Sequence, residues 1–132
     1  TKGAKAWDTI KAASNLFFQS NSLFVCLFDG RYMKYTPTEI KSKFEDCCAG
    51  TAYNYRETVL THADDENSKF NPALHSQLNV KCEVSLCFPY RVNGRVTGSI
   101  EIINPKITDH STEEIKLFSN LCSILLNTPS LK

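Results

Sequence analysis

The residues of this 132-residue sequence with the most potential for chemistry are six cysteines. A disulfide framework, a zinc site and reduced thiols are the alternatives for such a set. Several of these cysteines lie inside apolar stretches, where a free cysteine behaves as a small hydrophobic residue. Because the sequence also lacks a C-x-x-C motif, we expect reduced thiols in a cytoplasmic protein. The six are Cys26, Cys47, Cys48, Cys82, Cys87 and Cys122.

Other reactive side chains lack the spacing that their chemistry requires. The run Asp64-Asp65-Glu66 could hold a cation, but it has neither the alternating oxygen ligands nor the central glycine of an EF-hand loop. The sequence also contains no G-x-S-x-G turn, which a hydrolase of that type uses to expose its nucleophile. We therefore expect no metal site and no catalytic residues, and hence a domain that is not itself an enzyme.

Charge and composition limit the partners of the chain. The 15 Lys and Arg nearly balance the 14 Asp and Glu, so no basic surface for nucleic acid is expected. No apolar run approaches the roughly 20 residues that cross a bilayer, so we expect no membrane insertion. A hydrophobic content of 42% suits one core in one domain. We expect residues 1–132 to form a single domain excised from a larger multidomain protein.

The clearest element is a β-hairpin near the C-terminal end. Residues 83–92 and 95–103 have the composition of strands, and Asn93-Gly94 between them tolerates the positive φ angles of a type I′ turn. Alternation along the second strand places Glu101 on the face opposite Ile100 and Ile102. That face could contact a ligand or solvent.

Helices are predicted at both ends of the chain. Apolar residues recur every three to four positions over residues 6–18, which indicates an amphipathic helix. Ser111 and Glu114 form a capping box that predicts a second helix from there onwards. After the first helix, the apolar run 23–28 can pair through a turn with residues 32–35.

The middle of the sequence is less regular. Residues 38–44 are ambiguous between a short helix and a strand, residues 48–57 could form a short helix, and residues 58–61 have the composition of a brief strand. The segment 63–77 is polar and rich in turn formers. The whole order predicts an α+β domain in which helices flank an antiparallel sheet.

The hairpin strands resemble those of GAF domains. Ser85-Leu86-Cys87-Phe88-Pro89, the Asn93-Gly94 turn and the V-x-G-x-x-x-x-x-N string from Val96 to Asn104 carry the likeness. Upstream, Cys48-Ala49-Gly50, residues 59–61, Asp64-Asp65 and Lys69-Phe70-Asn71 follow in the order of the family's short helix, strand and lid. The sequence is most similar to GAF domains of cyclic-nucleotide phosphodiesterases, where similar L-C-F-P and E-L-V-N strings occur.

This resemblance implies a GAF-like, or profilin-like, α+β fold. The antiparallel sheet would carry the N- and C-terminal helices on one face and short cap helices and loops on the other. Two registers compete at the start of the sheet. We prefer residues 23–29 as the first strand over the register in which they are the second strand and Ser14 lies on the first.

The family resemblance also implies a ligand site between the sheet and the cap. Ala49 matches a small residue that lets the backbone approach a ligand, and Glu101 matches a pocket carboxylate. His75 and Leu78 stand where cyclic-nucleotide binders have acidic or hydroxyl groups, which removes acceptors for a purine or ribose. Taken alone, a histidine in a polar segment is more often a surface residue. The ligand-binding candidates are Cys48, Ala49, Asn71, His75, Leu78, Cys82 and Glu101.

Three functions follow from the resemblance. The first is a regulatory sensor of a phosphodiesterase-like signalling protein, which binds a small molecule such as cAMP or cGMP, requires no cofactor and acts on an effector domain in the same chain. The second is a degenerate GAF domain that serves as a docking module and forms a homodimer through its terminal helices. The third is a free methionine sulfoxide reductase in which Cys48 and Cys82 react.

Overall fold

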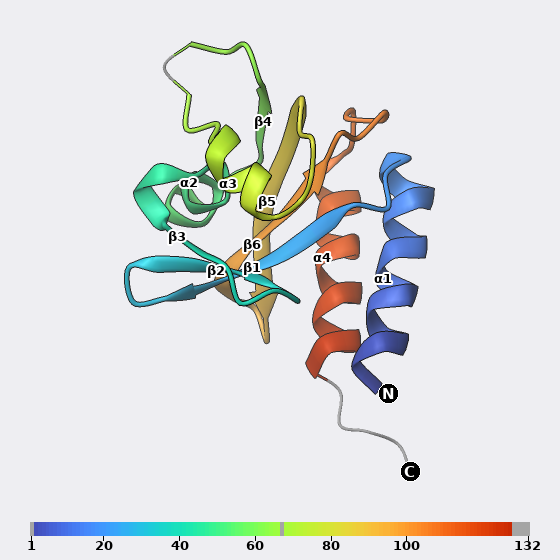
Figure 1. Ribbon diagram of the computed structural model, residues 1–132. Helices are drawn as coiled ribbons and strands as arrows, with labels where there is room; N and C mark the ends of the chain where they lie inside the picture. Colours follow the sequence, from blue (N-terminus) through green and yellow to red (C-terminus); the bar gives the residue numbers. More distant parts are fainter. Residues whose placement is uncertain (1, 67, 128–132) are drawn as a thin grey trace.

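The computed structural model describes residues 2–66 and 68–127, which form three layers (Figure 1). A six-stranded antiparallel sheet separates two long helices on one face from two short helices on the other. The helices are α1 (Lys2–Phe18), α2 (Cys48–Tyr55), α3 (Pro72–Gln77) and α4 (Thr112–Asn127), with a 3-10 helix η1 (Phe44–Asp46). The strands are β1 (Leu23–Asp29), β2 (Tyr32–Thr36), β3 (Lys41–Lys43), β4 (Val59–His62), β5 (Val84–Val92) and β6 (Arg95–Ile103).

The strand order of the sheet is β3-β2-β1-β6-β5-β4. Its centre is the pairing of β1 with β6, which runs from Leu23 opposite Ile102 to Leu27 opposite Gly98. This pairing joins the first and last hairpins of the chain into one sheet. As a result, β6 lies in the interior of the sheet, and its side chains meet helices on both faces.

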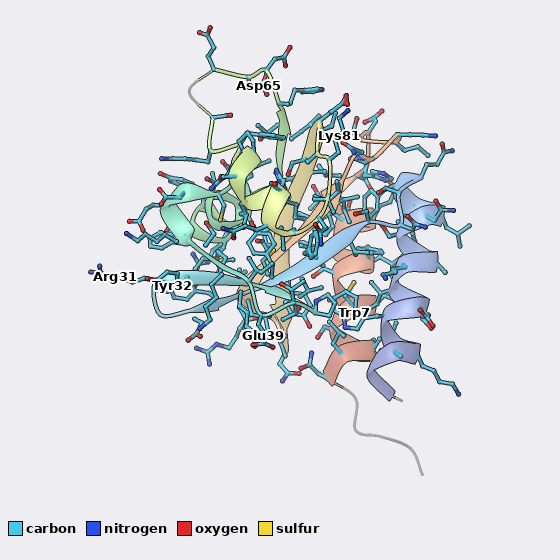
Figure 2. All side chains as sticks on the ribbon, viewed as in Figure 1. Trp7, Arg31, Tyr32, Glu39, Asp65 and Lys81 are labelled. Atoms are coloured by element: carbon cyan, nitrogen blue, oxygen red, sulfur yellow. The ribbon has the colours of Figure 1, made fainter. Side chains whose placement is uncertain are left out.

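Both predicted hairpins are confirmed. Asn93 and Gly94 have φ angles of 53° and 80°, as a type I′ turn between β5 and β6 requires. The hairpin of β1 and β2 turns at Gly30, which has a φ angle of 69°. Its tip, which carries Arg31 and Tyr32, lies on the side of the molecule away from the long helices (Figure 2).

The helices α1 and α4 lie side by side and bury one core against the sheet (Figure 1). Phe18 of α1 and Phe118 of α4 are fully buried, and their rings meet edge to face with centroids 5.1 Å apart. Phe88 of β5 packs against both rings. Each such side chain stabilises the fold by about 1.5 to 3 kcal/mol, so this core fixes the long helices on the sheet.

The capping box of α4 is present as predicted. The backbone N–H of Glu114 donates to the Ser111 hydroxyl over 3.1 Å, and the backbone N–H of Ser111 donates to the Glu114 carboxylate over 2.9 Å. These bonds satisfy two backbone donors at the start of the helix. They explain why α4 begins at this position.

The structure settles the open assignments in the first half of the chain. Residues 23–29 form the first strand, while Ser14 lies within α1 and donates to the carbonyl of Ser20 over 2.6 Å. Within the ambiguous residues 38–44, Lys41–Lys43 form the edge strand β3, and Phe44 begins η1. The polar segment 63–77 contains the short helix α3 at its end, and Asn67 in the same segment lies outside the described residues.

Within residues 2–66 and 68–127, no helix combines the length and the apolar character that crossing a bilayer requires.

Candidate functional site

The predicted ligand-binding residues gather on the face of the sheet that α2 and α3 cover. We call the buried residues between this face and the two short helices the cap cluster. Strands β1, β2, β5 and β6 form its floor, and α2 and α3 form its roof. The cap cluster consists of Phe24, Cys26, Met33, Tyr35, Cys47, Cys48, Ala49, Ala52, Leu74, Leu78, Cys87 and Ile103.

A polar pair is buried next to the cap cluster. The His75 Nε2 atom lies 2.9 Å from Oε2 of Glu101, and the side chains of the two residues are 5% and 1% exposed. The general preference of a lone histidine for the surface therefore does not apply to His75. Glu101 does not face solvent either, although solvent was one of the two environments expected for it. A third side chain joins the pair, because the Ser85 hydroxyl donates to the same Glu101 oxygen over 2.6 Å.

Local sequence explains how α3 presents His75 to the sheet. The Asn71 side chain accepts a hydrogen bond from the backbone N–H of Leu74, and Pro72 occupies the first turn, where its missing N–H costs nothing. The helix is short, and its buried residues Leu74 and His75 point towards the sheet, as does Leu78 at its C-cap. Apolar neighbours thus carry the imidazole into the interior.

Glu101 reaches the same place from the other side. Along β6 its side chain shares a face with Ser99 and Ile103, while Ile100 and Ile102 belong to the core beneath the long helices. Ser99 and Glu101 thus point towards the cap. The Ser99 hydroxyl uses this direction to donate to the carbonyl of Ala49 in α2 over 2.7 Å.

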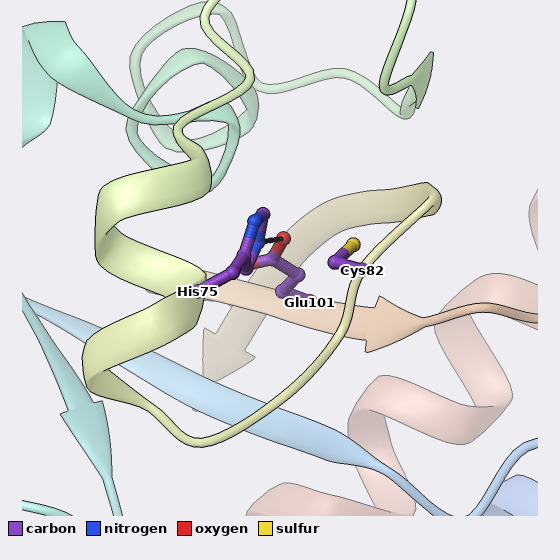
Figure 3. Close-up of side chains that lie close together, drawn as sticks. All are labelled: His75, Cys82 and Glu101. Atoms are coloured by element: carbon purple, nitrogen blue, oxygen red, sulfur yellow. Dashed lines mark hydrogen bonds and ion pairs between the residues drawn. The ribbon is translucent and has the colours of Figure 1, made fainter.

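Cys82 lies beside the buried pair of His75 and Glu101 and carries a further potential ligand atom. It lies on the loop between α3 and β5, and its side chain converges with those of His75 and Glu101 (Figure 3). One potential ligand atom from each of the three lies within 4.8 Å of the other two. Burial, followed by the nearby Glu101 carboxylate, raises the pKa of the Cys82 thiol to about 12. The thiol therefore stays protonated at neutral pH, and it contacts the Val84 carbonyl at 3.3 Å.

The other four predicted residues contribute to packing or to helix capping. Cys48, Ala49 and Leu78 are buried in the cap cluster, where Leu78 fills space as an apolar side chain. Asn71 caps α3, and its amide also donates to the carbonyl of Asp46 over 3.0 Å. Both ends of the Asn71 side chain are therefore engaged. The structure brings together His75, Cys82 and Glu101, and places the other four around them.

Ser85 was not among the predicted site residues. It is fully buried, and its hydroxyl lies 2.6 Å from Glu101 and 3.4 Å from the sulfur of Cys87. A signal for it existed in the sequence, because a hydroxyl residue stands at the start of an otherwise apolar strand. The position of α3 could likewise have been predicted from the pair Asn71-Pro72, which is typical of a helix start.

Two atoms of the buried pair lack a hydrogen-bond partner among the described residues, namely Nδ1 of His75 and Oε1 of Glu101. Leaving a buried polar atom unpaired costs about 1 to 3 kcal/mol. The pair therefore has unused capacity for a ligand, either a small molecule with complementary polar groups or a metal ion.

The raised pKa values of the cysteine thiols disfavour covalent chemistry. Burial raises the pKa of Cys48 to about 11, and burial raises the pKa values of Cys26 and Cys87 well above the usual range. Reactive cysteines need the opposite shift, since the thiolate is the nucleophile. All six cysteines are free.

Comparisons with known proteins give structural similarity without sequence similarity. The amino-acid sequence matches no protein-family model, and no curated protein matches it. Among solved structures, it is similar to the GAF domain of a two-component sensor histidine kinase from Bacillus halodurans, with a TM-score of 0.64, 14% identity, and coverage of 92% of this chain and 89% of that one.

Two further solved structures are similar to this chain. The GAF domain/HD domain protein from Geobacter sulfurreducens has a TM-score of 0.62 and 14% identity, over 92% of this chain and 87% of that one. The free methionine-R-sulfoxide reductase from Neisseria meningitidis has a TM-score of 0.68 and 12% identity, over 95% and 77%. At identities this low, the structural similarity shows the fold and does not identify a ligand. The curled antiparallel sheet with its four α-helices therefore gives this chain the GAF-like α+β fold.

Proposed function

We propose that this chain is a regulatory GAF domain of a cytoplasmic signalling protein, which binds a small polar molecule between its sheet and its cap. The observation that carries the proposal is the buried pair of His75 and Glu101 with its two unpartnered atoms. A molecule that supplies partners for Nδ1 and Oε1 would recover the free energy that these atoms lose on burial. The free energy of ligand binding would therefore come from contacts with this pair beneath the cap.

Binding requires the cap to move. Leu74 and Leu78 of α3 are buried in the cap cluster, so a ligand the size of a nucleotide has to displace this helix. The preceding segment, residues 63–66, is exposed and polar and can follow such a displacement. A ligand that favours the displaced cap shifts a two-state equilibrium, which an effector domain in the same chain would detect.

Cyclic nucleotides are the first candidate ligands, because the strands from Ser85 to Asn104 resemble those of phosphodiesterase GAF domains. The free Oε1 of Glu101 could accept a hydrogen bond from the exocyclic amine of a purine or from a ribose hydroxyl. His75 and Leu78 depart from the residues typical of cyclic-nucleotide binders. Other purines therefore belong in the same ligand series.

Thermal unfolding with cAMP, cGMP and other purines tests this proposal. A ligand at 100 times its dissociation constant should stabilise the chain by about 2.7 kcal/mol. Glu101→Gln should remove the effect, whereas Glu113→Gln, which changes an exposed carboxylate of α4, should preserve it. If none of these compounds raises the unfolding temperature at millimolar concentration, the nucleotide version of the proposal fails.

A second candidate function is a docking module that acts as a homodimer. It is favoured by two exposed leucines on the outer helical layer, Leu16 of α1 and Leu117 of α4, which are 82% and 60% exposed. Sedimentation at increasing protein concentration tests this function. A wild-type dimer that Leu117→Lys converts to a monomer would support it, and a monomer at high concentration would refute it.

We do not propose catalysis for this domain. The elevated thiol pKa values of Cys48 and Cys82 oppose the reductase chemistry that the resemblance allows. A thioredoxin-coupled assay with free methionine sulfoxide checks this point. Turnover that Cys48→Ser or Cys82→Ser abolishes would establish the enzyme and overturn the non-catalytic proposal.

A further inference from the structure

We infer that His75, Cys82 and Glu101 form a binding site for a divalent transition metal ion, with Zn²⁺ as the ion that suits them best. This inference uses the same side chains as the proposed small-molecule site, but it does not depend on a sensor role. It assigns a metal ion to that site, and neither the amino-acid sequence nor the comparisons with known proteins indicate one.

The three side chains converge from three separate elements (Figure 3). Helix α3 supplies a ring nitrogen, the interior strand β6 supplies a carboxylate oxygen, and the loop before β5 supplies a sulfur, all within 4.8 Å of one another. Ligand atoms around a tetrahedral zinc ion are about 3.5 Å apart, given bond lengths of about 2.0 to 2.3 Å. The 4.8 Å limit exceeds this spacing, so metal binding would draw the three side chains closer together, and Cys82 lies on a loop.

His75 and Glu101 each have one polar atom whose bonding capacity the described residues do not use. Nδ1 of His75 and Oε1 of Glu101 are buried without partners among the described residues. Meanwhile Ser85 holds the other carboxylate oxygen of Glu101. A hydrogen bond of this kind orients a ligating carboxylate, and such outer partners are typical of metal sites in proteins.

The charges also match. A bound divalent cation deprotonates a coordinating thiol, so Zn²⁺ would replace the proton that Cys82 holds in the free chain and release it to solvent. The Cys82 thiolate and the Glu101 carboxylate then carry two negative charges, which the cation neutralises, and a neutral imidazole completes the set. The resulting site has no net charge, which suits a location where Glu101 is 1% exposed. Bringing a cation to this place offsets the cost of burying both anionic ligands.

The combination of nitrogen, sulfur and oxygen ligand atoms favours one type of metal ion. Ca²⁺ and Mg²⁺ prefer sites made only of oxygen, whereas Zn²⁺ accepts all three ligand types. Three protein ligands leave a fourth tetrahedral position for water or a small external ligand, as in zinc sites that are not purely structural. Cys82 is the least buried of the three residues.

Metal binding to the complete chain tests the inference. Chelator-treated protein is dialysed against Zn²⁺ and analysed for bound metal, and Co²⁺ is then substituted as a spectroscopic probe. We expect one ion per chain and a near-ultraviolet band from charge transfer between a thiolate and Co²⁺. Wild-type protein without stoichiometric metal, or without this band, overturns the inference.

Matched variants locate the site. Cys82→Ala should abolish the thiolate band and weaken the binding of Zn²⁺ by more than about 100-fold, whereas Ser85→Ala, which removes an outer partner, should weaken it by about 10- to 100-fold. Cys122→Ala removes a thiol on the opposite face of the sheet and should change neither. His62→Gln removes a surface histidine beside Asp65, so loss of the bound ion in this variant would show chelation at the surface and overturn the inference.

The results separate this inference from the proposed function. Metal binding is measured without nucleotides, and the wild-type Co²⁺ spectrum decides the outcome even if a variant fails to fold. A chain that binds Zn²⁺ but no purine refutes the nucleotide proposal alone. A chain that is stabilised by a nucleotide and gives no thiolate band refutes the metal site alone.

Discussion

Nε2 of His75 lies 2.9 Å from Oε2 of Glu101, and this contact joins the cap helix α3 to an interior strand of the sheet. It is the point at which a change in the cap would reach β6. On the other side of β6, Ile100 and Ile102 pack beneath the long helices. A ligand that alters the pair therefore acts one residue away from the core that holds α1 and α4.

Breaking the pair of His75 and Glu101 on one side should cost more stability than removing both polar groups together. His75→Leu leaves the buried carboxylate with only Ser85, so we expect the free energy of unfolding to fall by about 1 to 3 kcal/mol. The double variant His75→Leu/Glu101→Met removes both polar groups and should be at least as stable as the single variant. Urea unfolding measures both. Losses that simply add in the double variant would contradict this expectation.

Gly98 should tolerate no side chain. A Cβ atom at this position of β6 would overlap with the carbonyl oxygen of Cys26 on the neighbouring strand β1. Because the obstacle is backbone, Gly98→Ala should destabilise the chain by about 3 kcal/mol or more. Denaturant unfolding checks this, with Ala13→Gly in α1, expected to cost at most about 1 kcal/mol, as a comparison. An unchanged midpoint for Gly98→Ala would mean that β1 and β6 are not packed this closely.

Asn104 should hold the loop that carries Cys82. Its side-chain oxygen accepts from the backbone N–H groups of Glu83 and Val84, and its amide donates to the Lys81 carbonyl over 2.6 Å. Its φ angle is 53°, in the left-handed region. Asn104→Gly removes only the hydrogen bonds, whereas Asn104→Ala adds backbone strain of about 1 kcal/mol.

We therefore expect both Asn104 variants to be less stable than the wild type, by about 1 to 3 kcal/mol, with alanine the worse of the two. Thermal unfolding gives this order. Both should also weaken metal binding at Cys82. If glycine proved worse than alanine, the larger backbone entropy of glycine in the unfolded chain would outweigh the strain that alanine takes at this φ angle.

Glu114 should make stability depend on pH in the acidic range. Hydrogen bonds from Ser111, with a smaller contribution from His110, lower the pKa of this carboxyl in the folded chain. A lowered folded-state pKa means that its stabilisation is present above the ordinary glutamate pKa and is lost as the pH falls through the lowered value.

Glu114→Gln should therefore lose stability relative to the wild type at neutral pH, and the two should converge in acid. Denaturant midpoints across this pH range measure the difference. Glu113→Gln removes the same charge from the same turn and keeps the reciprocal hydrogen bonds, so its difference from the wild type should vary less with pH. An equal pH dependence for both variants would assign the effect to charge alone.

The amino-acid sequence alone determined the elements that depend on neighbouring residues. Asn93-Gly94 set the turn between β5 and β6 because both residues tolerate positive φ angles, and Ser111 with Glu114 set the start of α4 by satisfying backbone donors. The alternation along β6 also placed Glu101 opposite Ile100 and Ile102. These signals act over a few residues, so they can be recognised without tertiary structure.

Only the tertiary structure decided what Glu101 faces. His75 lies 26 residues away along the chain and reaches it through α3, a six-residue helix that is too short for its apolar periodicity to be recognised. The loop that carries Cys82 is held by hydrogen bonds from Asn104, which lies 22 residues after Cys82 in the sequence. Contacts between such distant segments depend on how β6, α3 and the loop pack in three dimensions, and local sequence patterns do not encode that packing. The sequence thus determined the layers of the fold, and the packing of those layers assembled the site.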